Sequence, residues 1–121
     1  MNTTGKIALI VDPDEATAIS LARKLSVLGL DSLTASGVET ALETLAWLEP
    51  DIVLMSQDAD GDNGVKRISA SGERRRPLVI VSDNADIGAM GDAIWQGASE
   101  CLMQPFDEEI LEFKLQQTGV L

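Results

Sequence analysis

The chain has 121 residues, with 20 acidic side chains against 9 basic ones, one cysteine and no histidine. This length fits a single domain, and a hydrophobic fraction of 45% is typical of a globular chain rather than a disordered one. The lone cysteine excludes an internal disulfide, and the lack of histidine excludes Cys/His zinc sites and catalytic sites with a histidine base. A net charge of −11 disfavours direct binding to nucleic acid, and no apolar run is long enough for a membrane span, so we expect a cytoplasmic protein.

The first half of the chain alternates apolar runs with amphipathic segments. Strands are predicted over residues 6–11 and 31–35, and helices over residues 16–28 and 36–48. Gly29 is placed to end the first helix. Ser36 and Glu39 have the spacing of a capping box, which predicts the start of the second helix.

The second half repeats this alternation. Strands are predicted over residues 52–55, 78–81 and 101–103, and helices over residues 65–70, 86–96 and 107–118. Near-continuous apolar strands that alternate with helices are typical of a parallel sheet covered on both faces. The sequence therefore predicts an α/β fold: one three-layer, doubly wound domain with five strands and five helices.

In such a fold, ligands bind beyond the carboxyl ends of the strands. Four groups of polar residues and prolines follow predicted strands: Asp12, Pro13 and Asp14; Ser56, Gln57 and Asp58; Ser82 and Asp83; Gln104 and Pro105. These residues are the first candidates for a functional site.

Six segments carry a resemblance to a known family. They are Ile10-Val11-Asp12, Pro50-Asp51-Ile52-Val53-Leu54, Gly61-x-x-Gly64, Pro77-Leu-Val-Ile-Val-Ser82, Gly97-Ala98 and Pro105-Phe106-Asp107. From Lys6 to about Leu115 the chain resembles the receiver domain of two-component response regulators. The resemblance implies the flavodoxin-like receiver fold, with strand order 2-1-3-4-5, over residues 1–121. It fits either a stand-alone protein or the amino-terminal domain of a longer regulator.

The resemblance also implies where this chain departs from a working receiver. Asp12 stands at the first of two adjacent acids that hold Mg²⁺ in the family, and Ser82 at the hydroxyl that contacts the phosphoryl group. Three other positions are changed: Pro13 replaces the second acid, Ser56 the phosphoacceptor aspartate and Gln104 the lysine. Cys101 stands at the position of the aromatic switch residue, and the resemblance implies a cis bond between Gln104 and Pro105.

These departures bear directly on the chemistry. A serine hydroxyl such as that of Ser56 needs a neighbouring base before it can act as a nucleophile, and Gln104 brings no positive charge to a phosphoryl group. Asp12 and Asp14 remain only as weak candidate ligands for Mg²⁺, so we expect no cofactor. We expect a pseudo-receiver that is not phosphorylated by the usual route. Ser56 and Gln104 are expected to form a neutral hydrogen-bonded pair.

Because the strand-end residues are expected not to take a phosphoryl group, we expect the function to depend on a surface that binds another protein. Candidate contacts for a protein partner, or for a second copy of the chain in a homodimer, are Ala89, Met90, Ala93 and Trp95. Trp47 is a second tryptophan that is expected to be exposed. The basic run at residues 74–76 is interpreted as a solvated loop or, alternatively, as a docking site for an acidic partner.

Two other functions remain open at this point. The chain could still be phosphorylated at a non-standard acceptor, with Ser56, Asp58 and Asp60 as candidates, or it could sense a small ligand in the strand-end pocket. The alternating acids Asp58, Asp60 and Asp62 indicate a solvated acidic loop or a metal loop, although the glutamate that closes a calcium loop is missing. We expect no enzymatic activity, because no acid–base pair of suitable geometry can be nominated.

Overall fold

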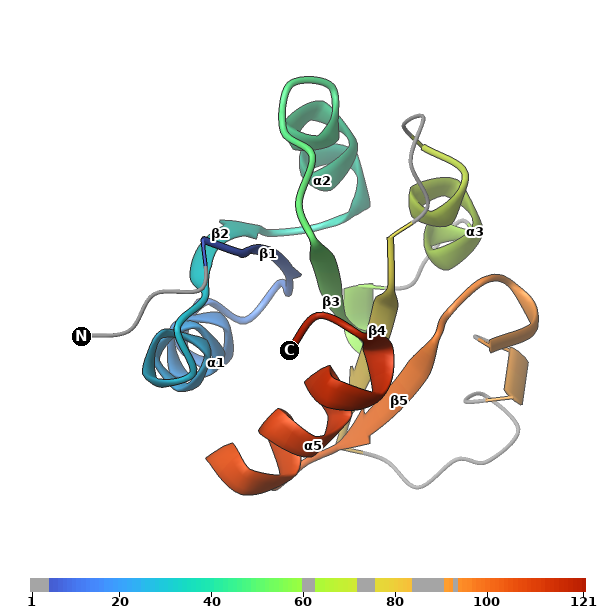
Figure 1. The fold of residues 1–121 in the computed structure, drawn as a ribbon. Coiled ribbons are helices and arrows are strands. Elements are labelled where there is room, and N and C mark those ends of the chain that lie inside the picture. The colour runs from blue at the N-terminus through green and yellow to red at the C-terminus, as the bar shows by residue number, and fades with distance from the viewer. Residues whose placement is uncertain (1–4, 60–62, 72–75, 84–90, 93) are drawn as a thin grey trace.

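In a computed structural model, five parallel strands form one sheet in the order β2-β1-β3-β4-β5 (Figure 1). The structure describes every residue except 1–4, 60–62, 72–75, 84–90 and 93. The strands are β1 (Ile7–Val11), β2 (Asp31–Ala35), β3 (Ile52–Ser56), β4 (Leu78–Ser82) and β5 (Glu100–Met103). This strand order confirms the predicted topology.

The described residues form four α-helices and one short 3₁₀ turn. These are α1 (Glu15–Val27), α2 (Val38–Leu45), η1 (Gln57–Ala59), α3 (Gly64–Ser69) and α5 (Glu108–Thr118). The fourth predicted helix, over residues 86–96, lies mostly outside the described residues. Within it, residues 91, 92, 94 and 95 have helical backbone.

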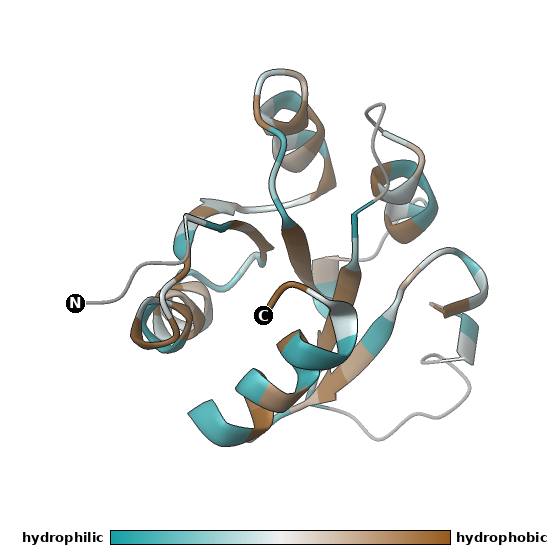
Figure 2. Cartoon of the chain, in the orientation of Figure 1, coloured by the Kyte–Doolittle hydropathy of each residue, from teal (hydrophilic) through white to brown (hydrophobic). Residues whose placement is uncertain are grey.

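Two apolar layers hold the helices against the sheet. On one face, α1 and α5 pack against side chains such as Ile10, Leu54 and Leu102. On the other face, α2 and α3 pack against the alternate side chains, such as Leu9 and Ile80. Figure 2 shows the strands β3 and β4 as hydrophobic along their length, whereas α5 alternates between polar and apolar residues. Both faces of the sheet are therefore covered, as the apolar strands predict.

The prediction for α2 was wrong at both ends. The helix is capped by Gly37 in extended conformation, with no side-chain cap from Ser36, so the capping box does not form. At the other end, the N–H groups of Ala46 and Trp47 bond three residues back, to Glu43 and Thr44. Such bonds tighten the last turn and end a helix. As a result, α2 stops at Leu45 instead of Leu48.

Two glycines have backbone roles that other residues fill poorly. Gly29 follows α1 with a φ of 91°, the left-handed conformation that terminates many helices. Gly97 has a φ of 126°, and a Cβ atom there would lie 2.7 Å from the Ser69 hydroxyl oxygen. Gly97 thus lets the segment before β5 approach the end of α3 closely. None of the helices in the described ranges is both long and apolar enough to cross a bilayer.

Candidate functional site at the strand ends

The carboxyl ends of β1, β3 and β4 bring the predicted residues together around a small hollow, the strand-end hollow. Its volume is about 80 Å³. The residues that line it are Asp12, Asp14, Thr17, Ser56, Gln57, Asp58, Val81, Ser82, Asp83 and Gln104. Of the changed family positions, Ser56 and Gln104 therefore face this hollow, whereas Pro13 does not line it.

The two acids that follow β1 have different environments. Asp12 is partly buried, and this burial raises the pKa of its carboxyl group. A hydrogen bond from the Asp14 N–H lowers this pKa, whereas the nearby carboxylates of Asp14 and Asp58 raise it; the net effect is a raised pKa. That N–H lies 2.8 Å from Asp12 Oδ1. Asp14 instead caps α1: its carboxylate accepts the Thr17 hydroxyl at 2.9 Å and the Ala16 N–H at 3.1 Å. The hydrogen bonds from Thr17 lower the pKa of Asp14.

The predicted hydrogen bond between Ser56 and Gln104 does not form in the described structure. The Ser56 hydroxyl oxygen accepts the N–H of Asp58 at 3.2 Å. Ser82 is 3% exposed, and its hydroxyl donates to Oε1 of Gln57. The backbone N–H of Gln104 donates to the Ser82 carbonyl at 2.8 Å.

Sheet register explains this difference in pairing. In the β3–β4 ladder Ser56 pairs with Val81, so the next residue, Gln57, is level with Ser82. In the β4–β5 ladder Ser82 pairs with Met103, which leaves Gln104 one residue beyond the ladder. Gln57 is thus a site residue that the sequence reasoning named but gave no role. Its position directly after β3 was the available signal.

The described residues do not fit the Mg²⁺ site that the fold family implies. Mg²⁺ prefers one or two carboxylates in near-octahedral geometry. Pro13 offers no ligand at the second acidic position, and the Asp14 carboxylate is engaged with the start of α1. Within the described ranges, no three acidic or cysteine side chains gather closely enough to hold a metal ion. The acidic loop over residues 60–62 lies outside these ranges.

The switch position on β5 holds a half-buried thiol. Burial raises the pKa of Cys101, and the neighbouring Glu100 raises it further, while Lys114 lowers it. Glu100 itself binds the Lys114 amine at 3.0 Å. Burial would raise the pKa of Glu100, but its hydrogen bonds from Lys114 and the Cys101 N–H outweigh this, so the pKa is lowered. A thiol that is hard to ionise has low reactivity.

The candidate partner residues are described only in part. Ala89, Met90 and Ala93 lie outside the described residues. Trp95 is 92% exposed, and Trp47 is 71% exposed, as predicted for both tryptophans. Sequence reasoning missed further exposed apolar side chains on β5 and α5, which are Met103, Ile110 and Phe113.

The expectation of a solvated basic loop was wrong for its last residue. The Arg76 side chain is only 5% exposed, and its guanidinium lies 3.3 Å from the Glu49 carboxylate. It also donates to the Ser71 carbonyl at 3.2 Å. Arg76 is therefore a buried, paired side chain, while residues 74 and 75 lie outside the described part of the chain.

Comparisons with known proteins support the fold and its family. No family model matches the chain. The chain is similar to the DNA-binding transcriptional regulator NtrC of Klebsiella pneumoniae, with 31% identity over 103 residues, 84% of this chain and 22% of that protein. The chain spans less than a quarter of the length of the first curated relatives that it matches.

Solved structures of receiver domains superpose closely on this fold. A putative response regulator from Chloroflexus aurantiacus has a TM-score of 0.85 and 24% identity, covering 96% of this chain and 98% of that one. A second match is the receiver domain of the sensor histidine kinase PA1611 from Pseudomonas aeruginosa, whose structure is described with magnesium coordinated in the active-site cleft. It has a TM-score of 0.84 and 21% identity, and the match covers 98% of this chain and 100% of that one. Because the strand order and these matches agree, the chain has the fold of the receiver domains of two-component response regulators.

Proposed function

We propose that this receiver domain is a pseudo-receiver, which signals by contact with a protein partner and not by phosphorylation at the usual position. We further propose that it acts in the cytoplasm and has no enzymatic activity of its own. The proposal rests first on the charge of the strand-end hollow. The described residues that line it include four aspartates and no lysine or arginine. A phosphoryl group there would meet carboxylates without a cationic partner.

The hydroxyl groups of the hollow support the same proposal. A nucleophilic serine needs an adjacent base that accepts its proton. Among the described residues Ser56 donates its hydroxyl proton to no base, and its oxygen accepts the Asp58 N–H. The Ser82 hydroxyl already donates to Gln57. Neither serine is thus arranged to attack or to hold a phosphoryl group.

The experiment is intact-mass spectrometry after incubation with Mg²⁺ and acetyl phosphate. We expect no added phosphoryl group on the natural chain. A matched variant that combines Pro13→Asp, Ser56→Asp and Gln104→Lys restores the family's groups at three positions and is expected to gain one. A phosphoryl adduct on the natural chain would overturn the proposal, and loss of that adduct in Ser56→Ala would identify the acceptor.

The partner surface is proposed at residues 94–95, β5 and α5. Trp95 is exposed next to Ile94, and Ile110 and Phe113 are exposed one turn apart on α5. Three exposed glutamates flank them on that helix, Glu108, Glu109 and Glu112. Exposed aromatic side chains are common anchors of interfaces, and acidic rims favour basic partners. A protein with an apolar centre and a basic rim therefore fits this surface.

Photo-crosslinking tests the surface with a matched pair of sites. A photoreactive residue at position 95 is expected to give a crosslinked protein, whereas one at position 47, which replaces the other exposed tryptophan, is expected to give none. A product of twice the chain's mass would identify a homodimer. Equal crosslinking from both positions would contradict the proposed surface.

A further inference from the structure

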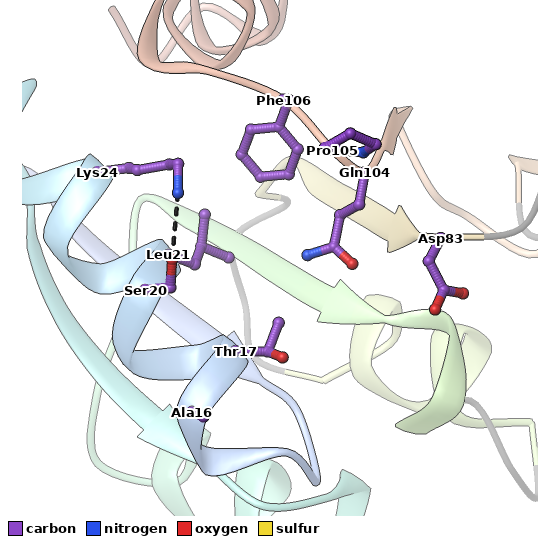
Figure 3. Close-up of a pocket in the computed structure, with 9 residues that line it drawn as sticks. All are labelled: Ala16, Thr17, Ser20, Leu21, Lys24, Asp83, Gln104, Pro105 and Phe106. Atoms are coloured by element: carbon purple, nitrogen blue, oxygen red, sulfur yellow. Dashed lines mark hydrogen bonds between the residues drawn. The ribbon is translucent and has the colours of Figure 1, made fainter.

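We propose that a second pocket, between α1 and the residues that join β5 to α5, binds a small organic anion with an apolar body and a hydrogen-bond donor at its far end. We call it the α1 pocket. Its volume is about 610 Å³. Its lining is formed by Ala16, Thr17, Ser20, Leu21, Lys24, Asp83, Gln104, Pro105 and Phe106 (Figure 3). Pockets for small ligands commonly have volumes of about 300–1,000 Å³.

Lys24 supplies a cation at one end of this pocket. Its amine donates to the Ser20 hydroxyl oxygen at 3.1 Å and lies 5.8 Å from the centroid of the Phe106 ring (Figure 3). The salt bridges recorded among the described residues involve Arg67, Arg76 and Lys114, not Lys24. A lysine ammonium has three donors, so further N–H groups of Lys24 can meet an anion. In a chain of net charge −11, such a cation is a distinctive feature.

The walls beside Lys24 are apolar, which selects an organic ligand over an inorganic ion. Leu21 is part of the buried core, and Phe106 packs against that core from the loop after β5. Pro105 continues this wall in Figure 3. A phosphate or sulfate ion would leave the apolar wall in contact with water. A ligand with a hydrocarbon or aromatic body would cover it.

The opposite end of the pocket sets the ligand's orientation. Figure 3 shows Asp83 and Lys24 on opposite sides, with the Gln104 amide between them. A carboxylate near Asp83 would be repelled, so the anionic group belongs at Lys24. A hydroxyl or amine at the other end can donate to the Asp83 carboxylate. The pocket therefore matches a molecule with an acid at one end and a donor at the other.

The test is a titration of the full chain, followed by ¹H–¹⁵N NMR, with three related probes. Para-hydroxybenzoate carries the acid, the ring and the donor, whereas phenol lacks the acid and benzoate lacks the donor. We expect saturable shifts at the amides of α1 and residues 104–106 with para-hydroxybenzoate. Benzoate is expected to bind more weakly, and phenol more weakly still.

Two variants of equal charge separate a lysine contact from general attraction. Lys24→Gln is expected to weaken binding of para-hydroxybenzoate roughly tenfold, as expected for loss of a charge-assisted contact. Lys66→Gln removes the same charge from the exposed side of α3 and is expected to leave binding unchanged. No saturable shift with para-hydroxybenzoate, or equal weakening by the two variants, would overturn the proposal. Either result leaves the proposed pseudo-receiver function untouched, since that function is tested by phosphoryl transfer.

Discussion

The strand-end hollow and the α1 pocket lie side by side and share Thr17, Asp83 and Gln104, yet they differ in size and in charge. The hollow has a volume of about 80 Å³ and is lined by carboxylates, hydroxyls and amides, whereas the α1 pocket has about 610 Å³, an apolar wall and one lysine. The hollow is therefore too small for a drug-sized ligand, which argues against a ligand sensor at that site. The difference in size and charge between the two cavities therefore comes from the lining residues that belong to one cavity and not to the other.

The largest expected effect comes from the wall of the α1 pocket. Leu21 is 3% exposed and belongs both to that wall and to the core between α1 and the sheet. Leu21→Ala should lower the free energy of unfolding by about 2–5 kcal/mol, because it removes buried methyl groups and leaves a cavity. Urea unfolding followed by circular dichroism measures it.

Ile19 offers the control in the same helix. It is 42% exposed, so Ile19→Ala should change the free energy of unfolding by less than about 0.5 kcal/mol. Similar losses in the two variants would contradict the role given to the core contact of Leu21, because alanine itself favours a helix and helix propensity would not lower the stability of either variant.

The second prediction concerns the loop that borders both cavities. Residues 104–106 lead directly into α5, whose first turn is capped by Asp107: its carboxylate oxygen Oδ1 accepts the Ile110 N–H at 2.9 Å. Asp107→Ala should cost about 0.5–2 kcal/mol of unfolding free energy. Asp107→Asn keeps an acceptor oxygen and should retain most of the stability in thermal unfolding. Equal losses in both variants would contradict a capping role.

The third prediction affects the hollow alone. The hydrogen bond from Ser82 to Gln57 joins β4 to the start of η1. A double-mutant cycle of Ser82→Ala and Gln57→Ala should give a coupling free energy of about 0.5–1.5 kcal/mol in chemical denaturation. The cycle is needed because Ser82 has interactions besides this hydrogen bond, so a single substitution would not isolate it. A coupling of zero would mean that this hydrogen bond adds nothing to stability.

The sequence predicted the fold better than the pairing within the site. Apolar runs located β1, β3 and β4, because a strand covered on both faces needs apolar side chains at nearly every position. The signal for β2 was weaker, since only its last residue, Ala35, is buried. β5 starts one residue earlier than predicted, at Glu100, whose carboxylate is neutralised by Lys114 from α5. That partner is 14 residues away in the chain. No local pattern could indicate it.

The same limit applies to the hollow and to Arg76. Strand ends indicated which residues gather there, but the register of β3 against β4 decides that Gln57, and not Gln104, meets the Ser82 hydroxyl. Arg76 looked like part of an exposed basic run until its partner Glu49 was placed beside it. Both outcomes depend on contacts between distant segments, which a periodicity argument does not reach.

The smallest expected effect is on the pH dependence of stability, where Asp12 and Asp14, the two acids that follow β1, should act in opposite directions. Burial raises the pKa of Asp12 above its ordinary value of 3.8, so the folded state holds that proton more tightly than the unfolded state. Its contribution to stability is therefore present below pH 3.8 and is lost as the pH rises through the raised pKa. Asp12→Asn cannot ionise and keeps an oxygen for the Asp14 N–H. It should be slightly more stable than the natural chain at neutral pH.

Asp14→Asn should show the reverse. Hydrogen bonds from Thr17 lower the pKa of Asp14, so its ionised form stabilises the fold above the ordinary pKa, and that stability is lost as the pH falls through the lowered value. The variant should therefore be less stable than the natural chain at neutral pH, and the difference should shrink in acid. Thermal unfolding of both variants and of the natural chain over a pH series measures whether each substitution raises or lowers the unfolding midpoint. If both substitutions shifted the midpoint in the same direction, the contrast between a buried acid and a helix-capping acid would be wrong.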